Sequence, residues 1–331
     1  MIGFGSASGR KADAERVELQ PPDISAWRTG NTGIPFVTTL DSGRPGPHAA
    51  INALMHGNEI SGAIALDHFM RQDLAPLRGK LSCIFANTAA FETFNPATPN
   101  ASRFIDEDMN RLWADGATDG GTNLERSRVR VLRPFFETVD MLLDLHSMQS
   151  ESPPLLLSGP REKGRMFARS LNSPAVIVCD TGHANGMRLR DFARFNTPGD
   201  PHVSILAECG QHWRRGTEGV AIDTVYRFLL ATGMIADDDA QPHLLNMPVP
   251  QHWIEVTKGF VPKHNNAAFT EAFIGMEVIP GCGTPFARDG DSIIHTPHDD
   301  CVLIMPSRQL APGQTAVRLG RRHAFDDGGD D

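Results

Sequence analysis

The chain has 331 residues, of which 40% are hydrophobic and 21% are charged, as in a soluble globular protein with a sizeable core. Its net charge of −9, from 31 basic and 40 acidic residues, argues against nucleic acid or an anionic membrane surface as a partner. No apolar stretch is long enough to span a membrane, and the N-terminal segment does not resemble a signal peptide.

Apolar and amphipathic segments alternate after a polar lead-in that covers residues 1–33. The expected strands cover residues 34–40, 49–55, 81–86, 141–145, 175–179 and 203–207. The expected helices cover residues 60–71, 124–138, 162–171 and 219–232. Continuous apolar strands that alternate with helices indicate an α/β fold with a largely parallel sheet covered on both faces.

The sequence pattern changes near residue 237, where an acidic, proline-bearing segment is typical of a linker. Beyond it, short strands are expected at residues 253–257, 268–273, 284–287, 292–295 and 301–305. Glycine, proline and aspartate turns separate them, which is typical of a small antiparallel or barrel-like domain. We therefore predict a first domain over residues 1–238, a small β-domain over 239–322 and a disordered acidic tail over 323–331.

His56 and Glu59 lie in the sequence His-Gly-Asn-Glu, between an expected strand and an expected helix. A His and a Glu at this spacing can bring a nitrogen and an oxygen ligand to one cation, although such pairs also occur on solvated helix faces. His146 directly follows another expected strand, and Asp144 on the same face could accept its second N–H. A lone His at a strand end is often structural, but the three residues together predict a catalytic zinc site with an open position.

The segment SRFIDEDMNRLW is too polar for a core and carries Arg103, Asp108, Asn110 and Arg111. Asn110 and Arg111 could hold the carboxylate of a substrate, because a guanidinium offers a rigid pair of donors. Arg103 could face an oxyanion that develops at a carbonyl. The alternative is a local cluster of ion pairs on a loop.

Glu208 directly follows the expected strand 203–207, where a buried carboxylate is costly unless it has a partner or a chemical role. Near a zinc ion it could take a proton from water and pass it to a leaving amine. The alternative is a buried glutamate that pairs with an arginine. His212, four residues further on, could line the same pocket.

The motifs His-Gly-Asn-Glu, Asp-x-Asn-Arg, Asp-Leu-His-Ser and Ala-Glu-Cys-Gly occur in this order. Together they resemble the succinylglutamate desuccinylase/aspartoacylase family of zinc carboxypeptidase-like hydrolases, over roughly residues 45–235. The resemblance implies an α/β/α sandwich with a mixed sheet, plus a small C-terminal all-β domain that narrows the entrance to the site. It also implies hydrolysis of the linear amide bond of an N-acyl amino acid, of acetyl or succinyl type, with one Zn²⁺ per chain.

The resemblance implies a role for each motif residue. It implies that His56, Glu59 and His146 are the zinc ligands. It implies that Glu208 acts as general base and acid, and that Arg103 polarises the scissile carbonyl. It implies that Asn110 and Arg111 hold the carboxylate of the amino acid, and that Asp108 is a supporting carboxylate.

The chain departs from the family in its substrate pocket. Some members place a tyrosine of the β-domain at the substrate, but Tyr226, the single tyrosine here, lies in an expected helix. The β-domain would have to use Arg288, His295 or His298 instead, or contribute no side chain at all. The candidates for a further substrate-binding arginine are Arg188, Arg190 and Arg194.

Two other functions would use the same motifs. A carboxypeptidase-like metallopeptidase could use the same carboxylate-binding residues, and a non-catalytic binding module could keep the fold without the chemistry. The complete set of ligands argues against the binding module. Five widely spaced cysteines indicate reduced thiols, so we expect a cytoplasmic protein with a small-molecule partner. Family members often self-associate, so a homo-oligomer is compatible with the resemblance.

Overall fold

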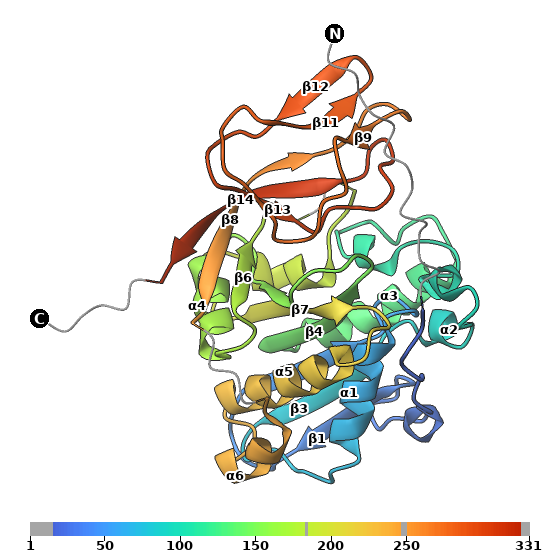
Figure 1. The fold of residues 1–331 in the computed structure, drawn as a ribbon. Coiled ribbons are helices and arrows are strands. Elements are labelled where there is room, and N and C mark those ends of the chain that lie inside the picture. Colours follow the sequence, from blue (N-terminus) through green and yellow to red (C-terminus); the bar gives the residue numbers. More distant parts are fainter. Residues whose placement is uncertain (1–15, 183–184, 246–249, 326–331) are drawn as a thin grey trace, which may run out of the picture.

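The computed structural model describes residues 16–182, 185–245 and 250–325 (Figure 1). The strands of its larger part are β1 (Val37–Asp41), β2 (His48–Ala53), β3 (Lys80–Phe85), β4 (Met141–Met148), β5 (Leu155–Leu157), β6 (Val176–Cys179) and β7 (Val203–Gln211). The α-helices are α1 (Ile60–Met70), α2 (Thr88–Phe91), α3 (Leu124–Phe136), α4 (Glu162–Ser170), α5 (Thr217–Ala231) and α6 (Asp237–Ala240). The 3₁₀ helices are η1 (Ser25–Trp27), η2 (Pro99–Ser102), η3 (Met109–Arg111), η4 (Leu189–Asp191), η5 (Ala193–Asn196) and η6 (Gln241–His243). None of these helices has the length and apolar character needed to span a bilayer.

The central strands are covered by helices on both faces, as their continuous apolar sequences predict. Ala49, Ile51 and Ala53 of β2 pack in the core with α1 and α5, whereas Ala50 packs on the opposite face with α3. Strands β3, β2, β4 and β7 are parallel to one another, so their carboxyl ends meet at one edge. Strand β1 is antiparallel to β3, and β5 is antiparallel to β7, which makes the sheet mixed. The expected α/β fold with a mixed sheet is confirmed.

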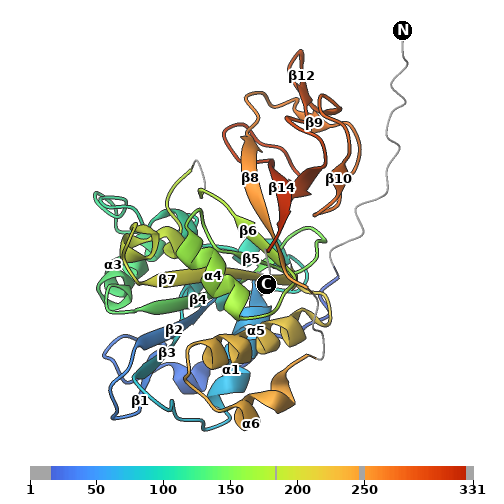
Figure 2. The same cartoon turned by 90° about the vertical axis from the view of Figure 1, so that its left-hand side faces the viewer.

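The C-terminal part extends the same sheet and adds a smaller one. Its strands are β8 (His252–Phe260), β9 (Ala268–Phe269), β10 (Val278–Ile279), β11 (Pro285–Asp289), β12 (Ser292–His295), β13 (Cys301–Ile304) and β14 (Val317–Ala324). The large sheet has the order β1-β3-β2-β4-β7-β5-β6-β8-β14-β13-β10, and the small sheet has the order β12-β11-β9. Figure 2 shows β8 and β14 rising from the helix-covered part into the C-terminal part. The boundary predicted at residue 238 stays a prediction.

Several sequence-based boundaries need correction. Strands β5, β10 and β14 were not expected, and β14 takes up the first two residues of the predicted tail 323–331. Residues 326–331 of that tail and residues 1–15 of the lead-in lie outside the described residues. The described part of the lead-in contains η1, and its Leu19 and Ile24 are buried in the main core. The predicted linker contains α6 and η6.

Candidate active site

The centre of the site lies where the chain leaves β2 and enters α1. Leu54 has a left-handed backbone (φ 60°), which turns the chain away from the sheet before His56. Gly57 packs tightly against α2, because a Cβ atom there would lie 2.4 Å from the helix backbone. Glu59 then immediately precedes α1. This turn directs the side chains of His56 and Glu59 to the carboxyl ends of the parallel strands, where ligands bind in such sheets.

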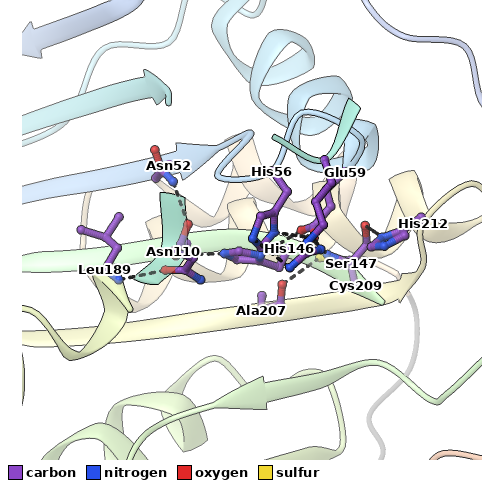
Figure 3. Close-up of polar contacts among 12 residues, drawn as sticks. Asn52, His56, Glu59, Asn110, His146, Ser147, Leu189, Ala207, Cys209 and His212 are labelled. Atoms are coloured by element: carbon purple, nitrogen blue, oxygen red, sulfur yellow. Dashed lines mark hydrogen bonds and ion pairs between the residues drawn. The ribbon is translucent and has the colours of Figure 1, made fainter. Parts of the chain in front are cut away.

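His56, Glu59 and His146 converge, as Figure 3 shows. The Nδ1 atom of His56 lies 2.7 Å from Glu59 Oε1, and the Nδ1 atom of His146 lies 2.8 Å from Glu59 Oε2. The three side chains are buried, and one candidate ligand atom from each lies within 4.8 Å of the others. Burial alone would raise the pKa of Glu59, but the two imidazoles outweigh it and hold that pKa well below its usual range.

The outer nitrogens of both imidazoles face carboxylates. His56 Nε2 lies 2.9 Å from Asp108 Oδ1. His146 Nε2 lies 3.1 Å from Asp144 Oδ2, and Asn52 donates an N–H to the other oxygen of Asp144 at 2.7 Å. An imidazole that donates its Nε2 proton to a carboxylate presents a lone pair at Nδ1, as a metal ligand must. Two such nitrogens and one carboxylate fit a tetrahedral zinc ion with one position open.

Glu208 lies within β7, and the strand register pairs it with His146 on β4. Both residues were expected just beyond their strands, but both strands continue past them. The Glu208 carboxyl is buried and lines the cavity, and its Oε2 atom has no hydrogen-bond partner among the described residues. Burial, only partly offset by His146, raises the pKa of Glu208 to about 8. Such a carboxyl is suited to accept and return a proton.

Arg103 and Asp108 lie against the other side of the His56–Glu59 pair. The guanidinium of Arg103 places Nη1 3.3 Å from Glu59 Oε1 and Nη2 2.9 Å from His56 Nε2. Asp108 Oδ2 lies 3.4 Å from Arg103 and 3.6 Å from Arg111. Burial alone would raise the pKa of Asp108, but the neighbouring imidazole and guanidiniums hold it well below its usual range. The cluster of ion pairs therefore exists, and it holds Arg103 at the cavity wall.

Asn110 and Arg111 are fixed by the segment that precedes η4. Asp108 accepts the backbone N–H of Asn110 at 2.9 Å and so caps η3. The Oδ1 atom of Asn110 accepts the backbone N–H of Leu189 at 2.9 Å. Gly186 packs on Arg111, because a Cβ atom there would lie 2.4 Å from the Arg111 carbonyl oxygen. Asn110 and Arg111 both line the cavity, and an amide together with a guanidinium offers donors that suit a carboxylate.

Ser147 and His212 form a further polar pair at the cavity, which confirms the expectation for His212. The hydroxyl of Ser147 lies 2.8 Å from His212 Nδ1, and its backbone N–H donates to Glu59 Oε2 at 3.1 Å. Burial lowers the pKa of His212 to about 3, so its imidazole is neutral. The motif residue after His146 thus helps to orient Glu59.

Apart from Asn52 and Asp144, the polar side chains described above line one cavity of about 550 Å³. Its floor lies at the carboxyl ends of β2, β4 and β7. One wall comes from the C-terminal part, namely the segment that links β13 to β14 and the start of β14. The residues of this wall are Met305, Ser307, Gln314, Thr315 and Arg318.

Residues 45–210 match the model of the succinylglutamate desuccinylase/aspartoacylase catalytic domain. The match spans half of the chain and contains every site residue from His56 to Glu208. The chain belongs to the succinylglutamate desuccinylase/aspartoacylase family. Members of this family are deacylases, so the protein is assigned to an enzyme family. No curated protein matches the chain in sequence.

Several solved structures share the fold of this chain. A succinylglutamate desuccinylase from Vibrio cholerae has a TM-score of 0.65 at 20% identity, covering 89% of this chain and 88% of its own. One from Vibrio parahaemolyticus has a TM-score of 0.64 at 17% identity, covering 87% and 86%. A product-bound ectoine utilization protein from Ruegeria pomeroyi has a TM-score of 0.60 at 15% identity, covering 91% and 92%. At these identities the likeness shows the fold alone.

The β-domain does not bring any of the three candidate side chains to the cavity. Among the described residues, those that line the cavity do not include Arg288, His295 or His298, because Arg288 and His295 lie in the small sheet and His298 lies against Thr257 of β8. Arg318 of β14 takes their place, and sequence reasoning missed it because β14 was not expected. Of the three upstream arginines, Arg188 lines the cavity, whereas Arg190 and Arg194 do not.

Proposed function

We propose that the protein is a zinc-dependent deacylase that hydrolyses the linear amide bond of an N-acyl amino acid to a carboxylate and a free amino acid. The observation that carries this proposal is the convergence of His56, Glu59 and His146 beside Glu208. A zinc ion held by the first three side chains would supply a Lewis acid and lower the pKa of water toward about 7.

Each of the remaining site residues has a separate role in hydrolysis. Glu208 takes a proton from the attacking water at Oε2 and returns it to the departing amide nitrogen. The guanidinium of Arg103 faces the carbonyl oxygen, where negative charge develops. Asn110 and Arg111 hold the carboxylate of the amino acid and so fix the amide relative to Glu208. Asp108 keeps the imidazole of His56 in place.

The cavity supports a compact substrate rather than a peptide. Its volume of about 550 Å³ lies within the range of small-molecule sites. The wall that includes Met305 and Arg318 lines one side of this cavity. An N-acyl amino acid fits this enclosure, and a carboxypeptidase would need a more open cleft.

The test is a hydrolysis screen of N-acetyl, N-succinyl and N-formyl amino acids and of short peptides with the zinc-reconstituted protein. A Glu208→Gln variant should bind zinc normally and lose turnover by about 10²- to 10⁴-fold. Glu92→Gln, at an exposed glutamate, is the matched control. Retention of more than a few per cent of activity by Glu208→Gln would remove Glu208 from the mechanism. Faster turnover of peptides would identify a peptidase, and an inert zinc-loaded protein would identify a binding module.

A further inference from the structure

The cavity has two sides, because the amino-acid portion and the acyl group extend from a scissile amide in opposite directions. Figure 3 shows Asn110 and His212 on opposite sides of His146. Asn110 belongs to the side that is proposed above to hold the carboxylate of the amino acid. The acyl group therefore extends toward His212, and we call this part of the cavity the acyl side.

The acyl side forms where β4 and β7 end together. The backbone N–H of His212 donates to the carbonyl of Met148 at 2.9 Å, and the side-chain amide of Gln211 donates to the carbonyl of Gln149 at 3.3 Å. Met305 of the C-terminal part reaches the same place, because it lines a small hollow together with Met148 and Gln149. The residues of the acyl side that line the main cavity are Ser147, Met148, Gln149, His212 and Met305.

The acyl side carries no cation among the residues that the structure describes. Burial keeps the imidazole of His212 neutral by lowering its pKa to about 3. Four arginines line the cavity, but each of them pairs with a carboxylate outside the acyl side. These pairs are Arg103 and Arg111 with Asp108, and Arg188 and Arg318 with Asp180. A charged end of an acyl group would therefore find no partner of opposite charge on the acyl side.

A hollow of about 100 Å³ adjoins the cavity at the acyl side. Met148, Gln149 and Met305 line both spaces, and the loop that carries Glu151 forms the rim of the hollow. This loop packs tightly on the C-terminal part, because a Cβ atom at Gly275 would lie 2.4 Å from the hydroxyl of Ser152. A hollow of this size has room for about four carbon atoms.

Two methionines stand between the cavity and the hollow. Met148 is buried in an apolar cluster with Leu157 and Leu206, which also line the cavity, and Met305 packs against this cluster. The backbone of Met305 is left-handed (φ 51°), which is uncommon for a large side chain and points to a functional constraint. Methionine side chains are flexible and apolar, so they adapt to an aliphatic ligand that lies between them.

We propose that the acyl side binds an uncharged aliphatic acyl group of about four to six carbon atoms, whose end passes between Met148 and Met305 into the hollow. The proposal rests on the proposed function and deepens it by naming the class of acyl group. An acetyl group would leave the hollow unfilled. The terminal carboxylate of a succinyl group would meet two thioethers and the carboxylate of Glu151 at the rim.

The experiment measures kcat/KM for N-acetyl, N-butanoyl, N-hexanoyl and N-succinyl derivatives of one amino acid, namely the amino acid that is released fastest in the hydrolysis screen. Each buried methylene contributes about fourfold, so the wild type should favour the N-hexanoyl over the N-acetyl substrate by about 30- to 200-fold. It should favour N-butanoyl over N-succinyl by about tenfold, because only the latter buries a charged end. Equal values within either pair, or the opposite preference, would overturn the proposal.

Replacing Met305 tests the position of the acyl group. Met305→Ala should reduce the ratio of N-hexanoyl to N-acetyl kcat/KM by about fivefold or more and leave the N-acetyl value near that of the wild type. Met305→Leu keeps an apolar side chain of similar size and should retain most of the ratio. Met166→Ala removes an exposed methionine of α4 and is the matched control. An unchanged ratio in Met305→Ala, or equal losses on both substrates, would overturn the proposal.

Binding without turnover separates this proposal from the proposed function. Hexanoate should raise the Tm of the zinc-loaded wild type more than acetate does at the same concentration, and Met305→Ala should remove most of this difference. If no N-acyl amino acid is hydrolysed but the difference is present and depends on Met305, the proposed function fails and the acyl position stands. If the difference is absent, or if Met305→Ala does not change it, the acyl position fails.

Discussion

Replacing Glu208 by glutamine keeps the size of the side chain and removes its charge. The substitution therefore isolates the free-energy cost of burying an ionised carboxylate in the cavity wall. In the metal-free protein, burial raises the pKa of Glu208 from its ordinary 4.5 to about 8. Between these pH values the folded protein keeps a proton that the unfolded chain releases. The stability that this proton contributes is therefore complete below pH 4.5 and is lost as the pH rises to 8. A tenfold change in the acid dissociation constant corresponds to about 1.4 kcal/mol. The wild type therefore loses about 5 kcal/mol of its free energy of unfolding over this pH range.

The assay is urea unfolding of chelator-treated wild type and Glu208→Gln at several pH values from 5 to 8.5. The free energy of unfolding of the variant should exceed that of the wild type by an amount that grows by about 4 kcal/mol across this range. The difference between the two proteins isolates Glu208, because His56, Glu59 and His146 are present in both. A difference that stays constant with pH would refute the inference that the carboxyl is buried without a hydrogen-bond partner for Oε2.

Three further predictions concern the metal site and its supports. His146→Ala should bind clearly less than one zinc per chain by elemental analysis, and an unchanged zinc content would exclude His146 as a ligand. Asp180→Asn should lower the free energy of unfolding in urea by about 3–5 kcal/mol, because Arg188 would keep a buried charge without this partner, whereas Glu92→Gln at the surface should leave it unchanged. Gly57→Ala should lower both the Tm and the zinc content, because the added Cβ would lie 2.4 Å from the backbone of α2; wild-type values for both would show that this turn tolerates a side chain.

The sequence predicts those parts of the fold that local patterns encode. The apolar strands and the turn at His56 follow from periodicity, and the parallel pairing of β2 and β4 then brings His146 to Glu59. Patterns fail where long-range pairing decides the structure. Strand β5 has only three residues and is held between β7 and β6 by its neighbours. The contact between Asp180 and Arg318 depends on the succession β6-β8-β14, which no local motif encodes.

The backbone pairing between β6, β8 and β14 has a consequence for the evolution of substrate range. Strand β8 pairs with β6 at four positions and with β14 at eight, so the C-terminal part cannot rotate away from the cavity without breaking a hydrogen-bonded ladder. The strand pairing therefore holds the C-terminal part beside the cavity. Changes in the segment 305–316 can enlarge or reduce it without altering any proposed zinc ligand or Glu208. Related chains can thereby acquire new substrates while the chemistry stays the same.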